Sequence, residues 1–208
     1  MRVIGGRLKG RRLIPPKDRR IRPSKARTRE AVFNIIESRY RDHLLDGNVA
    51  DLFAGTGAMG IEALSRGARH AVFVDSAPDA IAAIRQNLTA LDLTKVATVI
   101  QGEAGETRLG GPFDLIFMDP PYGTAGLTEK IKNMSTFGCI SANTILVLEM
   151  GKRESVPTFS GFKEVHKKVY GNSKIAVFSA FSQQTSQCAG ILLSKTVKFH
   201  VDDAKIRS

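Results

Sequence analysis

The sequence predicts an α/β fold in which helices cover both faces of a mainly parallel sheet. Short apolar runs typical of buried strands alternate with segments of helical periodicity along most of the 208 residues. A glycine-rich run at residues 51–60 joins the first of these strands to the helix that follows. The last two strands flank Gly171-Asn172, which indicates an antiparallel hairpin at the end of the sheet.

The elements follow one another in a regular order. A first helix is expected over residues 28–40, where apolar side chains recur at helical spacing. Strands are then expected at residues 48–53, 70–74, 96–100, 113–118 and 144–149, helices at 59–65, 78–91 and 126–134, and the hairpin at 162–170 and 173–181. We divide the chain into a basic extension (1–27), a main domain (28–182) and a C-terminal extension without an assigned role (183–208).

The positive charge of the chain is concentrated at its N-terminus. The formal net charge is +11 at pH 7, and the first 30 residues hold 12 cations against Asp18 and Glu30, which leaves about +1 (11 − 10) for the rest. Such an asymmetry is typical of an arm that binds a polyanion. A solvated basic tail is the alternative, but the Gly5-Gly6 pair between short apolar stretches favours a hairpin. The candidate contacts are Arg2, Arg7, Lys9, Arg11 and Arg22.

Composition argues against several classes of protein. The hydrophobic content of 42% supports a buried core, and Cys139 and Cys188 lack the spacing of a zinc site or a disulfide framework. No run approaches the roughly 18 apolar residues of a membrane span. The basic N-terminus also lacks the apolar stretch of a secretory signal. We therefore expect a soluble, cytoplasmic, monomeric protein that uses neither a metal ion nor a membrane.

The glycine-rich run predicts a nucleotide-binding loop. Gly55, Gly57 and Gly60 match G-x-G-x-x-G, whose glycines let the backbone approach a ligand at a helix N-terminus. Asp75 follows Gly55 by 20 positions, at the end of the next strand, where a carboxylate can accept hydrogen bonds from a ribose. A nicotinamide dehydrogenase would show the same spacing. Asp51 discriminates, because a carboxylate before the loop would repel a pyrophosphate but suits the cationic groups of S-adenosylmethionine.

A second motif lies at the end of the fourth strand. The run 113–118 is followed by Asp119-Pro120-Pro121-Tyr122, a carboxylate, two rigid residues and an aromatic ring. The Asp119 carboxylate and the Pro120 carbonyl could accept the two N–H bonds of an exocyclic amino group and direct its lone pair at a methyl donor. Tyr122 could stack on the base. An ordinary strand-terminating turn is the alternative, but the position about 60 residues beyond a glycine loop favours the functional interpretation.

At these residues the chain resembles the class I S-adenosylmethionine-dependent methyltransferases that modify amino groups. More closely, it is similar to the bacterial 16S ribosomal RNA guanine-N2 methyltransferases of the RsmD type. The resemblance covers residues 1–181, and its motifs are the opening Arg2-Val3-Ile4-Gly5-Gly6, Arg22-Pro23, the stretch 29–34, the run 51–60 and the segment 119–123. It implies a Rossmann-like sheet of seven strands with a reversed final hairpin, and an N-terminal extension that engages RNA.

The resemblance also implies roles for individual residues. The target guanine would be held by Asp119, Pro120, Pro121 and Tyr122, with Asp119, Pro120 and Tyr122 as the catalytic set. The methyl donor would contact Asp51, Phe53, Gly55, Gly57, Asp75 and Glu103. Two of these depart from the usual pattern of the family, because Asp75 is often Glu in relatives and Glu103 is often Asp. Neither change removes a carboxylate.

The sequence therefore predicts an enzyme that methylates N2 of a guanine in 16S ribosomal RNA, alone or within an assembling small subunit. A DNA adenine-N6 methyltransferase is the first alternative, since Asp-Pro-Pro-Tyr suits adenine equally well, although the chain shows no segment resembling a target-recognition insertion. A non-catalytic RNA-binding assembly factor is the second, and the intact glycine loop argues against it.

Overall fold

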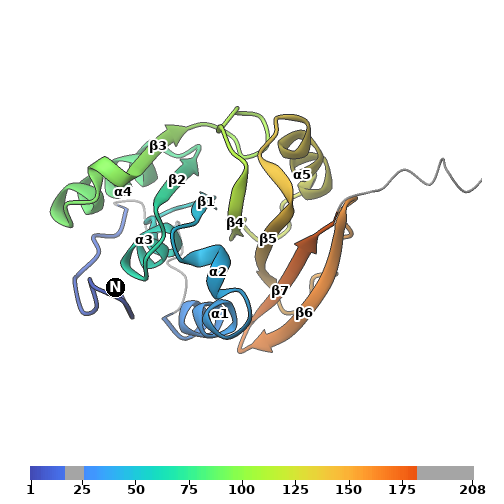
Figure 1. Ribbon diagram of the computed structural model, residues 1–208, viewed down its shortest axis with the longest axis horizontal. Helices are drawn as coiled ribbons and strands as arrows, with labels where there is room; N and C mark the ends of the chain where they lie inside the picture. The colour runs from blue at the N-terminus through green and yellow to red at the C-terminus, as the bar shows by residue number, and fades with distance from the viewer. Residues whose placement is uncertain (17–25, 182–208) are drawn as a thin grey trace, which may run out of the picture.

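The computed structural model describes residues 1–16 and 26–181, which form a seven-stranded sheet flanked by helices (Figure 1). The strand order is β3-β2-β1-β4-β5-β7-β6. The strands are β1 (Asn48–Leu52), β2 (His70–Asp75), β3 (Ala97–Gln101), β4 (Phe113–Met118), β5 (Ile140–Gly151), β6 (Phe162–Tyr170) and β7 (Ser173–Ala180). The first five run parallel, whereas β7 pairs antiparallel with both β5 and β6. The predicted fold class, including the reversed hairpin, is confirmed.

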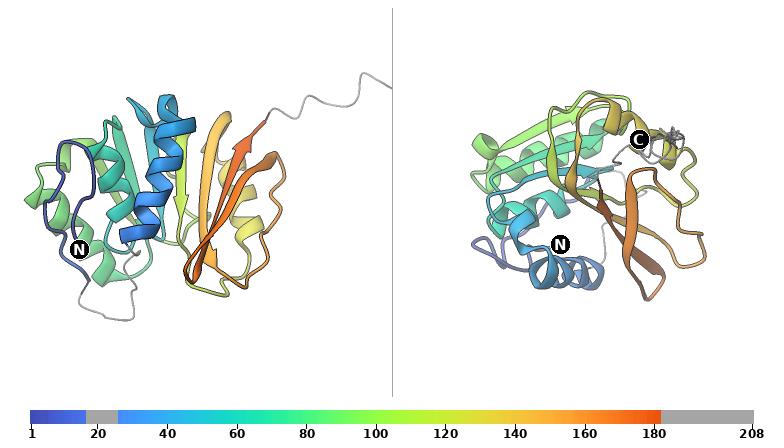
Figure 2. Two further views of the ribbon diagram at one scale, coloured as in Figure 1. Left: turned by 90° about the horizontal axis from the view of Figure 1, so that it is seen from below. Right: turned by 45° about the vertical axis from the view of Figure 1, so that its right-hand side comes forward.

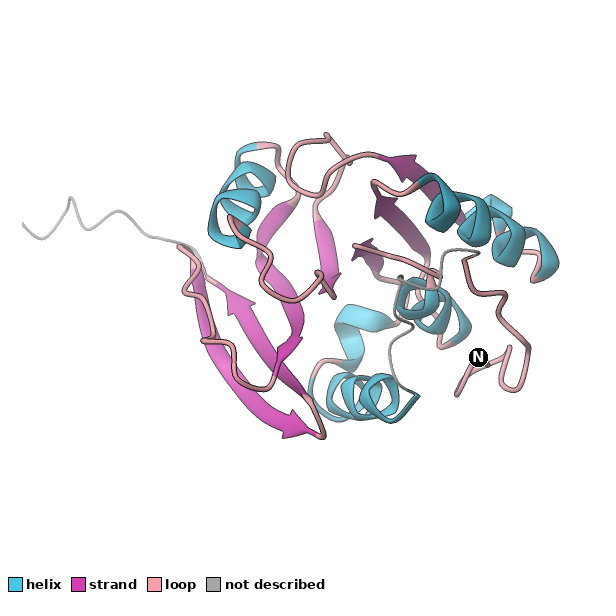
Figure 3. Ribbon diagram, turned by 180° about the vertical axis from the view of Figure 1, so that it is seen from behind, coloured by secondary structure: helices cyan, strands magenta, loops and turns pink. Residues whose placement is uncertain are grey.

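Helices cover both faces of this sheet (Figures 2 and 3). They are α1 (Ala26–Arg39), α2 (Arg41–Leu44), α3 (Ala58–Ser65), α4 (Pro78–Ala90), the 3-10 helix η1 (Thr94–Val96) and α5 (Leu127–Thr136). Buried side chains of α1 to α4 share one hydrophobic cluster with one face of the strands, while those of α5 belong to a second cluster on the other face. No helix in the described part of the chain is both long and apolar enough to cross a membrane.

Three elements differ clearly from the sequence prediction. Strand β5 begins at Ile140, four residues before the predicted start at residue 144. The residues between are polar or small and partly exposed, so their hydrophobic pattern did not indicate a strand, and β5 reaches them only after a register shift against β4. Helices α2 and η1 were not predicted, because four and three residues are too few for a helical period to be recognised. The remaining boundaries agree with the prediction or differ from it by at most two residues.

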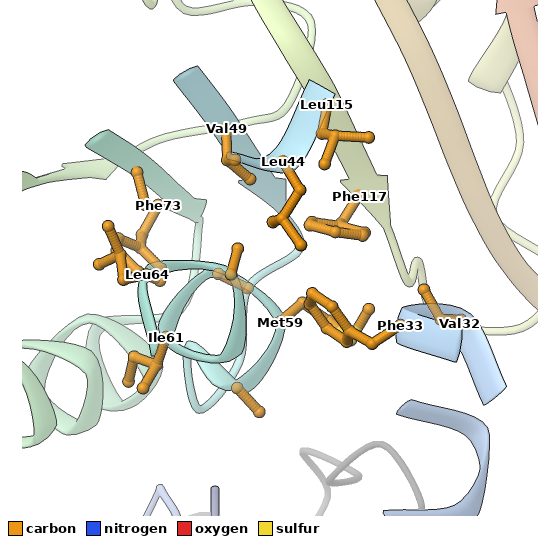
Figure 4. Close-up of a cluster of buried hydrophobic side chains, with 14 of the residues drawn as sticks. Val32, Phe33, Leu44, Val49, Met59, Ile61, Leu64, Phe73, Leu115 and Phe117 are labelled. Atoms are coloured by element: carbon orange, nitrogen blue, oxygen red, sulfur yellow. The ribbon is translucent and has the colours of Figure 1, made fainter. Parts of the chain in front are cut away.

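Helix α3 is buried on all sides, unlike an ordinary surface helix. Every residue from Ala58 to Ser65 is buried, in keeping with a sequence that is apolar nearly all round. Figure 4 shows its side chains Met59, Ile61 and Leu64 among the core residues of the strands and α1. Gly60 allows this close packing, because a Cβ atom there would lie 2.4 Å from the Phe73 ring on β2. The third glycine of the motif thus serves helix–strand packing.

The N-terminal residues cover the outer side of α3 as a hairpin. Arg2 and Arg12 form an antiparallel bridge, which confirms the predicted hairpin, and Val3, Leu8 and Leu13 are buried in the core cluster. The hairpin lies at the opposite end of the molecule from β6 and β7 (Figures 1 and 2). Its cationic side chains at residues 2, 7, 9, 11 and 12 are exposed.

Polar groups of the helices hold the hairpin backbone in place. The Glu62 carboxylate accepts hydrogen bonds from the N–H groups of Ile4 (2.9 Å) and Gly5 (2.6 Å). The Ser65 hydroxyl accepts from Leu8 N at 2.9 Å. Asn87 of α4 accepts from Ile14 N at 2.7 Å. The hairpin is therefore a fixed part of the fold over residues 1–14.

Candidate active site

A cavity of about 470 Å³ opens at the carboxyl ends of β1, β2, β4 and β5. Ligands of open α/β sheets bind at such ends. The residues that line it are Asp51, Phe53, Ala54, Gly55, Thr56, Ala58, Met59, Asp75, Ser76, Ala77, Asp119, Pro120, Pro121, Tyr122 and Glu149. The structure thus brings together eight of the residues predicted from the two motifs, from segments almost 70 positions apart.

The glycine loop is shaped by residues in left-handed backbone conformations. The φ angles are +59° at Phe53, +55° at Gly55 and +74° at Gly57. Phe53 is the unusual one, since a bulky side chain rarely adopts this conformation and such strain is concentrated at functional sites. Gly57 is the N-cap of α3 and does not itself line the cavity. The loop therefore turns sharply between β1 and α3 and presents its backbone to the cavity.

Asp75 fastens this loop to the end of β2. Its Oδ2 accepts a hydrogen bond from Gly55 N at 2.8 Å, and its Oδ1 accepts from Ala77 N at 2.9 Å. A carboxylate oxygen has two lone pairs, so each oxygen keeps the capacity for a second donor. Asp75 can therefore hold the loop and still accept hydrogen bonds from the hydroxyl groups of a ligand.

Asp51 is a buried carboxyl group in an acidic environment. It is 3% exposed, and its Oδ2 accepts a hydrogen bond from Gly60 N at 2.8 Å. Burial, and to a lesser extent the charges of Asp119 and Asp75, raise the pKa of Asp51 to about 8. Glu149 adds a fourth carboxyl group, and none of the described residues lining the cavity is a Lys or Arg. A cationic ligand would relieve this crowding of negative charge.

The Asp-Pro-Pro-Tyr segment forms one wall of the cavity. Asp119 is partly buried directly after β4, Pro120 is buried behind it, and Tyr122 is 50% exposed at the rim. Thr124 closes a turn by donating its backbone N–H to the Pro121 carbonyl at 3.1 Å, and its hydroxyl contacts the same oxygen. An acidic acceptor and an aromatic ring therefore border the same cavity.

Some predicted site residues lie elsewhere. Glu103 does not line the cavity, and its carboxylate lies 3.5 Å from the Lys130 ammonium group of α5. The exposed cations Arg2, Arg7, Lys9 and Arg11 are on the hairpin, outside the cavity lining. Arg22 lies outside the described residues, as does the predicted extension 183–208.

The sequence analysis also missed several residues of the cavity. Glu149 is the most informative, because it follows the apolar run of β5 as Asp75 and Asp119 follow theirs. The rule of a carboxylate at the end of a parallel strand would have found it. Met59, in the first turn of α3, and Ser76 and Ala77, in the loop after β2, carry no such signal, because none of them has a charged side chain at the end of a strand.

The described residues contain no group of three or more His, Cys, Asp or Glu side chains that could hold a metal ion. The carboxylates of the cavity are therefore not arranged as a metal-binding cluster. Cys139 is buried as a free thiol, and Cys188 lies outside the described residues.

The strand order and the cavity at the strand ends define a Rossmann-like fold of the class I methyltransferase type. The family described as "Conserved hypothetical protein 95" matches residues 1–179. YlbH of Bacillus subtilis is 34% identical over 184 residues, covering 86% of this chain and 98% of YlbH. "Ribosomal RNA small subunit methyltransferase D" of Escherichia coli is 29% identical over 189 residues, covering 89% and 93%.

The solved structure of YhhF from Escherichia coli superimposes with a TM-score of 0.76 at 28% identity, covering 88% of this chain and 99% of YhhF. The chain therefore belongs to the Conserved hypothetical protein 95 family, and the resemblance to the RsmD type drawn from the sequence motifs is confirmed.

Proposed function

We propose that this chain transfers a methyl group from S-adenosylmethionine to the exocyclic N2 amino group of a guanine in 16S ribosomal RNA. The observation that carries the proposal is a single cavity bordered by both the glycine loop and the Asp-Pro-Pro-Tyr segment. Its relative in Escherichia coli is named a ribosomal RNA small subunit methyltransferase, which favours RNA as the substrate.

The residues of the cavity fit the methyl donor. Its volume of about 470 Å³ lies within the range of small-molecule sites, and four carboxyl groups border it. S-adenosylmethionine supplies a methyl group on a positively charged sulfur, whose release needs no metal ion. Asp51 would face the cationic end of the donor, and Asp75 would accept hydrogen bonds from its ribose. The backbone around Phe53 and Gly55 would lie against it.

The residues of the Asp-Pro-Pro-Tyr segment would prepare the nucleophile. The lone pair of a guanine amino group is delocalised into the ring, which makes the nitrogen weakly nucleophilic. If Asp119 accepts one N–H and the Pro120 carbonyl the other, the lone pair is directed at the methyl carbon. The N–C bond forms as the S–C bond breaks, and the alkylated nitrogen then releases a proton to solvent. Tyr122 would stack on the base.

The N-terminal hairpin would hold the RNA backbone. Its five exposed cations project from a part of the fold that hydrogen bonds fix to α3 and α4. A fixed platform of this kind can position a phosphate backbone while the cavity receives one base. The division of residues 1–27 from the main domain remains a proposal about function, since the hairpin shares the core cluster.

The test compares methyl incorporation into 16S RNA and into duplex DNA, with the Asp119→Ala variant beside the wild type. We expect transfer to RNA, and a loss of about 10²–10³-fold in the variant, the range for removing one preorganised hydrogen-bonding group from a catalytic site. Binding of S-adenosylmethionine, measured by calorimetry, should change less than about threefold. Preference for DNA would favour the adenine-N6 alternative, and absence of donor binding would favour an assembly factor.

A further inference from the structure

We infer that Glu154 is a positioning residue for target binding, which holds the peptide after Tyr122 and so orients the Tyr122 ring. The inference rests on the proposed function for the identity of the target. Glu154 lies in the loop between β5 and β6 and lines a second cavity, of about 570 Å³. This cavity shares Pro120 and Pro121 with the donor cavity, so Glu154 lies behind the wall that the target base would contact.

The Glu154 carboxylate joins the ends of two neighbouring strands. Its Oε1 accepts a hydrogen bond from Gly123 N at 2.7 Å, in the turn that follows β4. Its Oε2 accepts from Gly151 N at 2.9 Å, at the end of β5. The Lys174 ammonium group of β7 donates to the main-chain carbonyl of Glu154. Each carboxylate oxygen therefore has a backbone partner, and the loop itself is tied to a third strand.

The geometry of the turn explains why the Gly123 N–H is available to this partner. Residues 121–124 form a turn closed by Thr124 N and the Pro121 carbonyl, with Gly123 third in order at φ +74°. A positive φ at the third residue is the mark of a type II turn. In that turn the peptide between the second and third residues is flipped, so the Gly123 N–H points away from the turn. The Glu154 carboxylate provides its acceptor.

The flipped peptide is the one that links Tyr122 to Gly123, so its plane sets the direction in which the Tyr122 side chain leaves the backbone. Tyr122 is 50% exposed, so burial constrains its ring less than it constrains a core side chain. A Cβ atom added at Gly123 would meet no atom within 4 Å, so the positive φ, and not a lack of space, explains why this position is a glycine. A carboxylate that stabilises the positive φ of Gly123 would therefore also hold the Tyr122 ring, on which the base would stack, at the rim of the donor cavity.

The decisive variant is Glu154→Gln, which keeps the size of the side chain. A glutamine has one acceptor oxygen, and its NH₂ group can only donate, so it cannot place a separate acceptor oxygen at each of the two N–H groups as the carboxylate does. Glu129→Gln is the matched control, because Glu129 lines the same second cavity but lies 3.4 Å from Lys132 on its own helix. Neither substitution touches Asp51, Asp75 or Gly55.

The first measurement follows the tyrosine rings by NMR and needs no substrate. The chain has three tyrosines, so the ring signals of Tyr122 can be assigned against those of Tyr40 and Tyr170. We expect Glu154→Gln to shift and broaden the Tyr122 signals and to move the Gly123 amide proton upfield, while Glu129→Gln changes neither. Unchanged Tyr122 signals in Glu154→Gln would overturn the inference, whatever the substrate proves to be.

The second measurement separates positioning from overall stability. For Glu154→Gln we expect kcat/KM toward 16S RNA to fall about 10- to 100-fold, the range for a misplaced contact group, with the dissociation constant of S-adenosylmethionine within about twofold of wild type. A purely structural defect would weaken donor binding as well. If the wild type is active on RNA and Glu154→Gln is equally active, the role of Glu154 is refuted while the proposed function stands. A wild type that does not act on RNA would refute the proposed function, and the NMR result would still decide on Glu154.

Discussion

The acidic cavity and the basic N-terminal hairpin are opposite in charge and are assembled in different ways. Four carboxyl groups border the cavity, and each comes from a residue within two positions of the carboxyl end of a strand. The five exposed cations of the hairpin come from one contiguous segment, residues 2–12, but that segment is held by residues more than 50 positions away. Local rules place the first set of charges, and long-range hydrogen bonds place the second.

The two regions meet at one buried side chain. The Asn87 amide nitrogen of α4 donates to the carbonyl of Ile14, where the hairpin ends, at 3.0 Å. The same nitrogen donates at 3.1 Å to the carbonyl of Thr56, which lines the cavity. The basic platform and the glycine loop are therefore fixed relative to one another, as an enzyme requires if it holds a long polyanion while one base enters a cavity.

The largest expected effect comes from removing the anchor of the hairpin. Glu62 is 1% exposed, and besides its two hairpin N–H groups it bonds Arg66 Nε at 2.9 Å and lies 3.5 Å from Arg29 Nε. Burial lowers the pKa of Arg29, and the Glu62 charge opposes that shift. Because Glu62→Ala leaves the buried Arg29 charge without this partner, we expect the free energy of unfolding in urea to fall by about 3–5 kcal/mol.

The control for this prediction is Glu37→Gln. Glu37 also pairs with Arg66, at 2.7 Å, but its side chain is 44% exposed, so the loss should stay below about 1 kcal/mol. Limited trypsin digestion adds a local measurement, since a released hairpin should be cut sooner at its arginines and lysines. If Glu62→Ala were as stable and as resistant as wild type, the hairpin would not depend on this carboxylate.

The difference in assembly also explains how much the sequence could predict. A carboxylate after an apolar run is recognisable by itself, and the parallel order of strands then brings Asp51, Asp75 and Asp119 to one edge. Glu149 obeys the same rule. Glu103 was expected at the donor by analogy alone, but the structure gives it Lys130 as a neighbour outside the cavity lining. Its role at the donor stays a prediction.

The position of the N-terminal hairpin against α3 could not be predicted in the same way. Gly5 and Gly6 indicated a hairpin, yet an added Cβ at Gly6 would lie 2.0 Å from the Ser65 carbonyl, so this glycine also permits close contact with α3. Glu62 within the apolar run of α3 had no visible partner in the sequence. Its function became evident only when residues 4 and 5 were found beside it.

The next effect concerns the acidity of the cavity. The pKa of Asp51 is raised to about 8 in the folded protein, so folding favours the protonated group. The stability that this provides is complete below its unfolded pKa, about 3.9, and is lost as pH rises toward 8. An asparagine at this position would not titrate, so we expect the stability of Asp51→Asn not to fall in this way. The free energy of unfolding of the variant, minus that of wild type, should increase by at least ~1 kcal/mol from pH 5 to pH 8.5.

The same variant distinguishes stability from binding. An ionised Asp51 attracts a cationic ligand, so Asp51→Asn should bind S-adenosylmethionine about tenfold or more weakly at pH 8.5. Urea unfolding at the two pH values and calorimetry at pH 8.5 measure the two effects. A variant that gained no relative stability at high pH would show that Asp51 is already ionised in the folded protein at neutral pH.

The smallest effect tests whether the cations of the hairpin contact phosphates at all. Arg7 and Lys9 are exposed on the hairpin loop. If about six phosphates are contacted, the log–log dependence of RNA affinity on salt should have a slope of −4 to −5. Replacing both residues by alanine should make that slope shallower by about 1.4, because each single-strand phosphate contact contributes about 0.7. Lys132→Ala on α5, across the sheet from the hairpin, should leave it unchanged.

Measuring donor binding in the same variants makes this last prediction more specific, because substitutions in the hairpin should change the salt dependence of RNA affinity and substitutions in the cavity should not. The Arg7→Ala, Lys9→Ala double variant should bind S-adenosylmethionine as wild type does, since neither side chain lines the cavity. Asp119→Ala, in turn, should retain the full salt slope for RNA, since the phosphate contacts lie on the hairpin. An identical slope for the double variant and the wild type would mean that the positive charge of the hairpin serves something other than RNA. The cavity alone would then have to select the substrate.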